Sequence, residues 1–215
     1  MKETEIYNRT EKLRESVNEF LGHINKKKGD YFSELTSDDL IAFKMALSDI
    51  NNVLTLKTTL NFTTWLTNFF EISKDKQKEI LKRVDETKPN TNGYDIELLD
   101  EKIIAEIKCI VPINGGNYYG AAQRNSILDD AIKLKNGKKI VKDTKDFLKI
   151  IGLIDLGQRT DIAIDKLCTE AVNVRTKEKI RIDRHEIVKH IKVIDNETKR
   201  TNLSTNFIYL KKVSV

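Results

Sequence analysis

The spacing of apolar side chains divides the chain into a helical first part and a mixed second part. In residues 1–84 apolar positions recur at helical intervals. They predict a helix over 3–24, a second helix that begins near Ser37 or Asp38, a third apolar stripe at 62–70, and a short charged helix from Ser73 to about Arg83. Residues 1–84 are therefore expected to be all-helical.

The pattern changes after the turn-forming residues 88–93. Residues 94–99 alternate like a strand, 103–111 are rich in β-branched side chains, and 147–156 are almost continuously apolar, as in a buried strand. Helices are expected at 119–135 and 161–170, and short strand-like pieces at 172–174, 180–182, 191–194 and 207–210. A strand, a helix and a strand in that order require a crossover, so at least one strand pair should be parallel.

These elements predict an α/β fold with a mixed central β-sheet flanked by helices. We expect residues 1–84 to form a helical region packed on the core, and residues 85–215 to form the core with a strand-rich tail. Together they would make one compact domain, which suits a chain of 215 residues.

The composition narrows the class of protein. Hydrophobic residues make up 39% of the chain, enough for a packed core, and no apolar run approaches the ~20 residues that span a bilayer. The residues after Met1 are charged and polar, unlike a signal peptide, and the chain has two cysteines. We therefore expect a cytoplasmic protein without a membrane partner.

Positive charge is concentrated in two stretches. The chain carries 38 Lys and Arg against 33 Asp and Glu, and residues 135–149 and 173–192 hold a clear excess of cations. Phosphate contacts need such charge, although a solvated surface would carry it equally well. The candidate DNA-binding residues are Arg124, Lys138, Lys139, Arg175, Lys177, Arg181 and Arg184.

The chemically informative residues are Asp95, Glu106 and Lys108. Strand side chains alternate between faces, so Glu106 and Lys108 should point to one side and Ala105 and Ile107 to the other. A carboxylate and an ammonium then lie together on an otherwise apolar strand, which is costly unless they pair or bind something. Asp95 belongs to the neighbouring strand and can reach the same place.

Two carboxylates and a lysine suit metal-dependent hydrolysis of a phosphodiester. Mg²⁺ binds through one or two carboxylates and leaves its other positions to water and phosphate oxygens. The lysine can orient the attacking water and offset developing negative charge. A surface ion pair between Glu106 and Lys108 is the alternative interpretation of the same residues.

These residues resemble the motif of the PD-(D/E)XK nuclease superfamily, which has the restriction-endonuclease-like fold. The matching stretches are Gly93-Tyr94-Asp95, with Tyr94 in place of the motif's proline, and Ile104-Ala105-Glu106-Ile107-Lys108-Cys109. The following helix and the strand at 147–156 agree with the order of elements in that family. The resemblance implies an Mg²⁺-dependent nuclease in which Asp95 and Glu106 bind the metal and Lys108 positions the water.

Two further residues are candidates for shaping the site. Glu97 lies two positions from Asp95 and would share its face, and Gln123 lies on the helix after the Glu106–Lys108 strand. No phosphate-binding or dinucleotide-binding glycine motif and no zinc-ligand spacing is found, so no nucleotide cofactor is expected.

The sequence therefore predicts an Mg²⁺-dependent endonuclease that acts on double-stranded DNA. A small chain of this kind looks most like a type II restriction endonuclease, and a homodimer is expected if both strands of a two-fold symmetric site are cut. Two alternatives stay open. One is a DNA repair or junction-resolving nuclease of the same superfamily, and the other is a non-catalytic nucleic-acid-binding module.

Overall fold

The computed structural model describes residues 8–87, 93–113, 117–138, 142–169 and 182–215. The chain forms two compact units, residues 1–50 and 51–215. This division differs from the one expected at residues 84 and 85. The boundary between the units falls within the helix at residues 37–69. The later part of this helix and the helix after it pack against the sheet of the second unit, so both belong to that unit.

The first unit consists of helices. α1 (Arg9–Asn25) begins at Asn8, whose side chain accepts a hydrogen bond from the Glu11 amide, and ends at Lys26 in the left-handed conformation (φ 53°). The four-residue helix α2 (Tyr31–Glu34) is joined to α1 by Asn18, which accepts from the Phe32 amide at 2.8 Å. α1 confirms the helix expected over 3–24 within the described residues, whereas α2 was not predicted.

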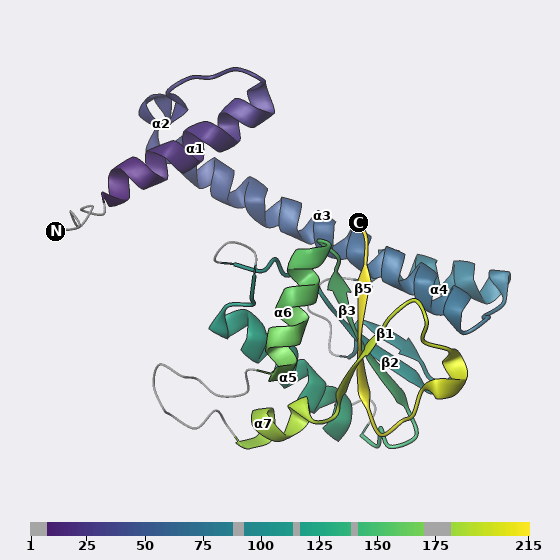
Figure 1. Ribbon diagram of the computed structural model, residues 1–215. Coiled ribbons are helices and arrows are strands. Elements are labelled where there is room, and N and C mark those ends of the chain that lie inside the picture. The colour runs from purple at the N-terminus through teal and green to yellow at the C-terminus, as the bar shows by residue number, and fades with distance from the viewer. Residues whose placement is uncertain (1–7, 88–92, 114–116, 139–141, 170–181) are drawn as a thin grey trace. The chain divides into compact units, whose positions relative to one another are not determined.

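α3 (Ser37–Phe69) starts in the first unit and continues into the second (Figure 1). The sequence suggested two helices here, one beginning near Ser37 and one at 62–70. The structure has one helix of 33 residues, because no glycine or proline interrupts these positions. α4 (Lys74–Glu86) follows, and its predicted cap is confirmed because the Ser73 side chain accepts from the Lys76 amide.

The second unit is built on a five-stranded mixed sheet in the order β1-β2-β3-β5-β4. β1 (Ile96–Leu98) runs antiparallel to β2 (Ile103–Lys108). The remaining neighbours, β3 (Leu148–Ile154), β5 (Ile208–Val213) and β4 (Ile191–Ile194), are paired in parallel. The predicted α/β class and its mixed sheet are therefore confirmed.

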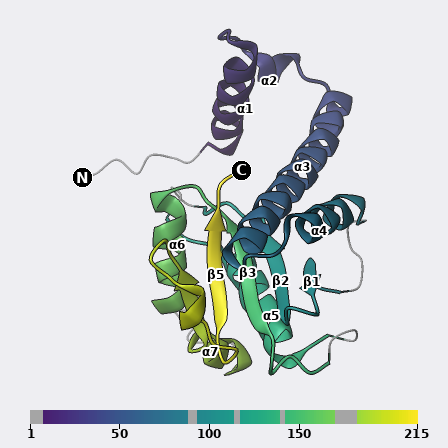
Figure 2. The same cartoon turned by 90° about the vertical axis from the view of Figure 1, so that its right-hand side faces the viewer.

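Helices cover both faces of this sheet (Figure 2). α5 (Ala121–Asn136), α6 (Gln158–Thr169) and α7 (Ile182–Val188) share one apolar cluster with Ile104 of β2. The later part of α3 and α4 share the other cluster with Ile103, Ala105 and Ile107. Alternate residues of β2 thus enter opposite cores, as the period of two in a strand requires.

The tail differs from the sequence prediction in one place. Ile182 begins α7, and a 3₁₀ turn at Arg200–Asn202 lies between β4 and β5. The strand-like piece expected at 180–182 is therefore wrong at Ile182, while residues 172–174 lie outside the described residues. Within the described ranges, no helix is both long and apolar enough to cross a membrane.

Candidate active site

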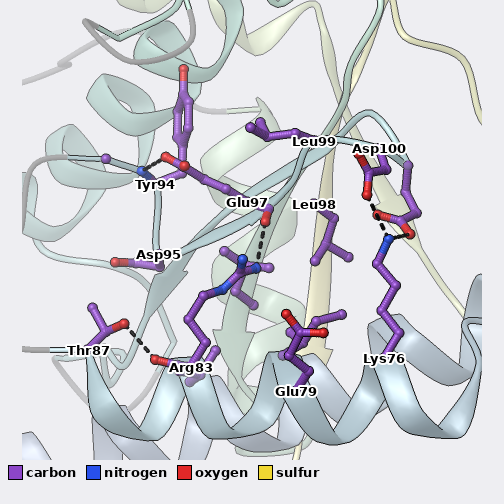
Figure 3. A pocket seen from close by; sticks show the side chains of 15 residues that line it. Lys76, Glu79, Arg83, Thr87, Tyr94, Asp95, Glu97, Leu98, Leu99 and Asp100 are labelled. Carbon is purple, nitrogen blue, oxygen red and sulfur yellow. Dashed lines mark hydrogen bonds and ion pairs between the residues drawn. The ribbon is translucent and has the colours of Figure 1, made fainter.

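Asp95 lies immediately before β1, where its backbone position brings it against β2. The register pairs Ile96 with Ala105, so Asp95 falls beside Glu106 in the antiparallel direction. The Asp95 carboxylate accepts a hydrogen bond from the Ile107 amide at 2.7 Å. Asp95 also lines a pocket of about 430 Å³ between α4 and β1, together with Glu79 and Arg83 (Figure 3). The carboxylate is therefore fixed at one oxygen and lies at the edge of a pocket.

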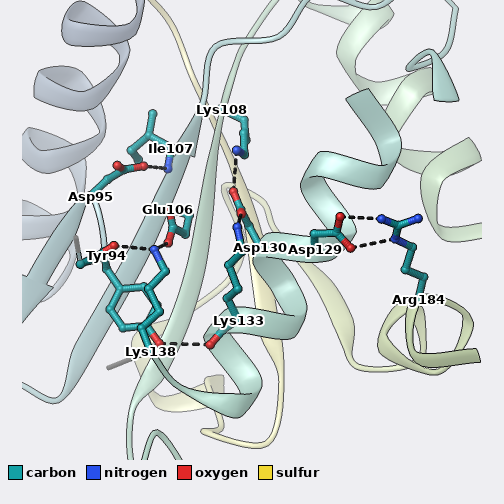
Figure 4. Close-up of polar contacts among 11 residues, drawn as sticks. Tyr94, Asp95, Glu106, Ile107, Lys108, Asp129, Asp130, Lys133, Lys138 and Arg184 are labelled. Carbon is teal, nitrogen blue, oxygen red and sulfur yellow. Dashed lines mark hydrogen bonds and ion pairs between the residues drawn. The ribbon is translucent and has the colours of Figure 1, made fainter. Parts of the chain in front are cut away.

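Glu106 and Lys108 point to the face of the sheet that α5 covers (Figure 4). Ile107, between them, enters the opposite apolar cluster. Only 6% of Glu106 is exposed, although the strand around it is apolar. The expected alternation of this strand is confirmed, and it places a buried carboxylate and a lysine side by side on one face.

The Glu106 carboxylate is held by a cation from outside the strand. Lys138, which follows the end of α5, donates to Oε1 of Glu106 and to the carbonyl oxygen of Gly93. Burial raises the pKa of Glu106 and the nearby negative charge of Asp95 raises it further, while Lys138 lowers it, so that the pKa is about 7. This effect of Asp95 agrees with the register of β1 and β2, which places Asp95 opposite Glu106.

Asp130 connects Lys108 to α5. This aspartate is 3% exposed, and one of its oxygens lies 2.6 Å from the Lys108 ammonium. Its other oxygen accepts from Lys133 at 2.8 Å. Glu106–Lys138 and Lys108–Asp130 are thus two separate ion pairs, which together with Asp95 are called the polar network.

Neither of the two expected site-shaping residues directs its side chain into this network. Glu97 accepts from the Tyr94 amide at 2.8 Å, which closes the turn before β1. Gln123 accepts from the Gly120 amide and donates to the Val111 carbonyl, both at 2.9 Å, so that its side chain satisfies the start of α5. Both residues organise the backbone next to the site.

The candidate DNA-binding residues fall into different surroundings. Lys138 is turned inward to Glu106, and Arg184 is paired with Asp129 at 2.7 Å. Arg124 lies half-buried in the first turns of α5 and has an interaction partner. Lys139, Arg175, Lys177 and Arg181 lie outside the described residues.

Asp130 was not identified from the sequence, and Lys138 was named there only as a candidate DNA-binding residue, not as a partner of Glu106. Asp130 carried a usable signal, because it lies in the apolar stripe that Ile127, Ala131 and Leu134 form along α5. A carboxylate in a buried stripe needs a partner, which marks it as structurally or functionally special. No signal of this kind marked Lys138 as a partner of Glu106, since it follows Gly137 in a lysine-rich stretch.

The residues present are compatible with a magnesium ion. In the described part of the chain, no three His, Cys, Asp or Glu side chains form a cluster that could hold a metal by themselves. Mg²⁺ does not require such a cage, because one or two carboxylates with water and phosphate oxygens suffice. The Glu106 carboxylate already has one positive partner, the Lys138 ammonium.

Comparisons with protein-family models, with curated proteins and with solved structures find no match.

Proposed function

We propose that this protein is an Mg²⁺-dependent endonuclease that hydrolyses phosphodiester bonds of double-stranded DNA. The observation that supports it is the position of Asp95 against the part of β2 that carries Glu106 and Lys108. Asp95 is hydrogen-bonded to the backbone between Glu106 and Lys108, and these two side chains share one face of the strand. This is the arrangement that the resemblance to PD-(D/E)XK nucleases leads one to expect.

Each residue has a distinct part in this proposal. Asp95 and Glu106 would hold the metal, which when bound polarises the phosphoryl group and lowers the pKa of a bound water. Lys108 would orient the attacking water and offset negative charge that develops at the phosphorus. Asp130, which lies 2.6 Å from the Lys108 ammonium, fixes the direction of that side chain.

A type II restriction enzyme is the form of the proposal that suits a small chain with one such site among the residues that the structure describes. Cutting both strands of a two-fold symmetric sequence would then require a homodimer. A repair or junction-resolving nuclease would use the same residues with a different substrate preference.

One observation favours a second candidate function, a non-catalytic nucleic-acid-binding module. Glu106 is paired with Lys138, and Lys108 with Asp130, so both members of the motif already have partners within the chain. In this interpretation the network stabilises the packing of α5 on the sheet and performs no chemistry.

Cleavage by the parent separates the two candidates, because a non-catalytic module cuts no DNA, and the variant Lys108→Met tests the role proposed for Lys108. Removing one electrostatic group that acts in the transition state lowers a rate on the order of 10²–10³-fold. We expect that loss in the single-turnover cleavage rate at saturating Mg²⁺, with the urea midpoint measured on the same preparation.

Lys133→Met is the matched control, because Lys133 is the other partner of Asp130 and does not lie on β2. It should cut at the parental rate. Parental cleavage by Lys108→Met would show that Lys108 takes no part in catalysis, whereas no Mg²⁺-dependent cleavage by the parent would support the non-catalytic module.

A further inference from the structure

Lys138 contacts one of the two carboxylates that would hold the proposed metal. Its ammonium contacts Oε1 of Glu106 and the carbonyl oxygen of Gly93, two residues before Asp95. It also lies 4.7 Å from the centre of the Tyr94 ring, and Figure 4 shows the side chain reaching across to Glu106. A carboxylate oxygen and a main-chain carbonyl oxygen are ligands that hard cations such as Mg²⁺ and Mn²⁺ prefer.

The buried position of Glu106 explains why its ionised form needs a cation. A carboxylate that is only 6% exposed is costly without a positive partner. Asp95 adds a second negative charge nearby. Without metal, the Lys138 ammonium offsets this charge.

The ammonium and a divalent cation compete for these oxygens. Two positive charges a few ångströms apart repel each other strongly in a partly buried site. Metal binding to Glu106 therefore requires Lys138 to leave. Lys138 can do so without unfolding α5, because that helix ends at Asn136 and Gly137 separates the two.

We propose that Lys138 is an internal counter-ion that takes the divalent cation's place in the metal-free protein and is displaced when the metal binds. This inference rests on the proposed function, because it assumes that Asp95 and Glu106 form the metal site. It adds that metal affinity is set by competition with Lys138 and that the Gly93 carbonyl belongs to the cation-binding oxygens.

The test is the affinity for Mn²⁺, read from the electron paramagnetic resonance signal of the free ion, with the full-length chain. Lys138→Gln removes the competing charge and keeps a hydrogen-bond donor. In the parent, Mn²⁺ has to break the charged hydrogen bond between Lys138 and Glu106, whereas in Lys138→Gln it does not. We therefore expect the dissociation constant for Mn²⁺ to be about tenfold lower, or more, in the variant. Lys135→Gln removes an exposed cation three residues earlier and should leave the affinity unchanged.

A second measurement covers a Lys138→Gln protein of low stability. A ligand that binds the folded state raises the melting temperature according to its affinity. The rise that Mn²⁺ causes should therefore be larger in Lys138→Gln than in the parent, whatever the starting value. Lys138→Arg, which keeps the charge, should resemble the parent.

Two results would overturn the inference, and they are distinguishable. Equal or weaker Mn²⁺ binding by Lys138→Gln, with binding that still depends on Asp95, would remove the counter-ion role and leave the proposed function standing. If the double variant Asp95→Asn, Lys138→Gln binds Mn²⁺ as tightly as Lys138→Gln does, the metal binds elsewhere. That result would contradict both the counter-ion role and the proposed function.

Discussion

At the scale of single residues, Glu106 shows how an apolar strand changes the chemistry of one carboxylate. Its side chain is buried beside a second carboxylate, Asp95, and its pKa is raised to about 7 mainly by burial. The nearby carboxylates of Asp95 and Asp130 disfavour its ionised form, whereas the Lys138 ammonium favours it. A group with this pKa changes its charge near neutral pH, which an exposed glutamate does not.

This pKa predicts how stability depends on pH. Because the folded protein holds the Glu106 proton more tightly than the unfolded chain, stability should fall as pH rises from about 4.5 towards 7. The size is on the order of 3 kcal/mol, since one pKa unit corresponds to about 1.4 kcal/mol.

The measurement is the free energy of unfolding in urea at about pH 5 and about pH 8, for the parent and for Glu106→Gln. The variant cannot ionise at this position, so its stability should depend less on pH than that of the parent. The same pH dependence in both proteins would show that Glu106 titrates normally.

At the scale of elements, the crossover from β2 through α5 to β3 assembles the site. It places Asp130 of α5 over Lys108 of β2 and brings Lys138 back to Glu106. The opposite face of the same strands is packed tightly. Gly152 of β3 is paired with Ile107, and the Phe62 ring of α3 packs against it.

Gly152→Ala should destabilise the protein by about 1–3 kcal/mol, the usual cost of overfilling a core. An added Cβ would lie 2.6 Å from atoms of both Phe62 and Ile107, and Phe62 is fully buried. The free energy of unfolding from denaturant titration measures this effect.

Phe62→Leu provides the matched comparison, because a smaller side chain makes room for the added methyl group. The double variant should be less destabilised than the two single variants added together, since the two positions are in contact. Simple additivity would mean that the backbone of β3 moves instead of the ring.

The sequence was sufficient for the parts of the fold that depend on local periodicity. The β2 pattern predicted which side chains share a face, and Ser73 predicted the start of α4. It was insufficient where a contact depends on tertiary structure. Nothing local distinguishes Lys138 from the other lysines near it, and the helical start of α7 at Ile182 was read as a strand because β-branched residues also occur in helices.

At the scale of the whole molecule, the two units differ in how many side chains they bury and in whether they contain the candidate site. In the described part of residues 1–50, Leu21 is the one buried side chain, and apolar residues of α1 and α3 such as Phe20 and Met45 are exposed. Asp95, Glu106 and Lys108 all lie within residues 51–215. The chemistry we propose therefore belongs to the second unit.

The most direct test of this account is the nicking of supercoiled plasmid DNA with and without Mg²⁺, by the parent and by Asp95→Asn. The asparagine keeps an oxygen that can accept from the Ile107 amide and removes the charge that would bind the metal. Glu97→Gln is the control, because Glu97 lies on β1 and its side chain caps the turn at Tyr94.

We predict that the parent and Glu97→Gln cut only when Mg²⁺ is present, and that Asp95→Asn binds DNA but does not cut it. Cleavage by Asp95→Asn at the parental rate, or no Mg²⁺-dependent cleavage by the parent, would contradict the account.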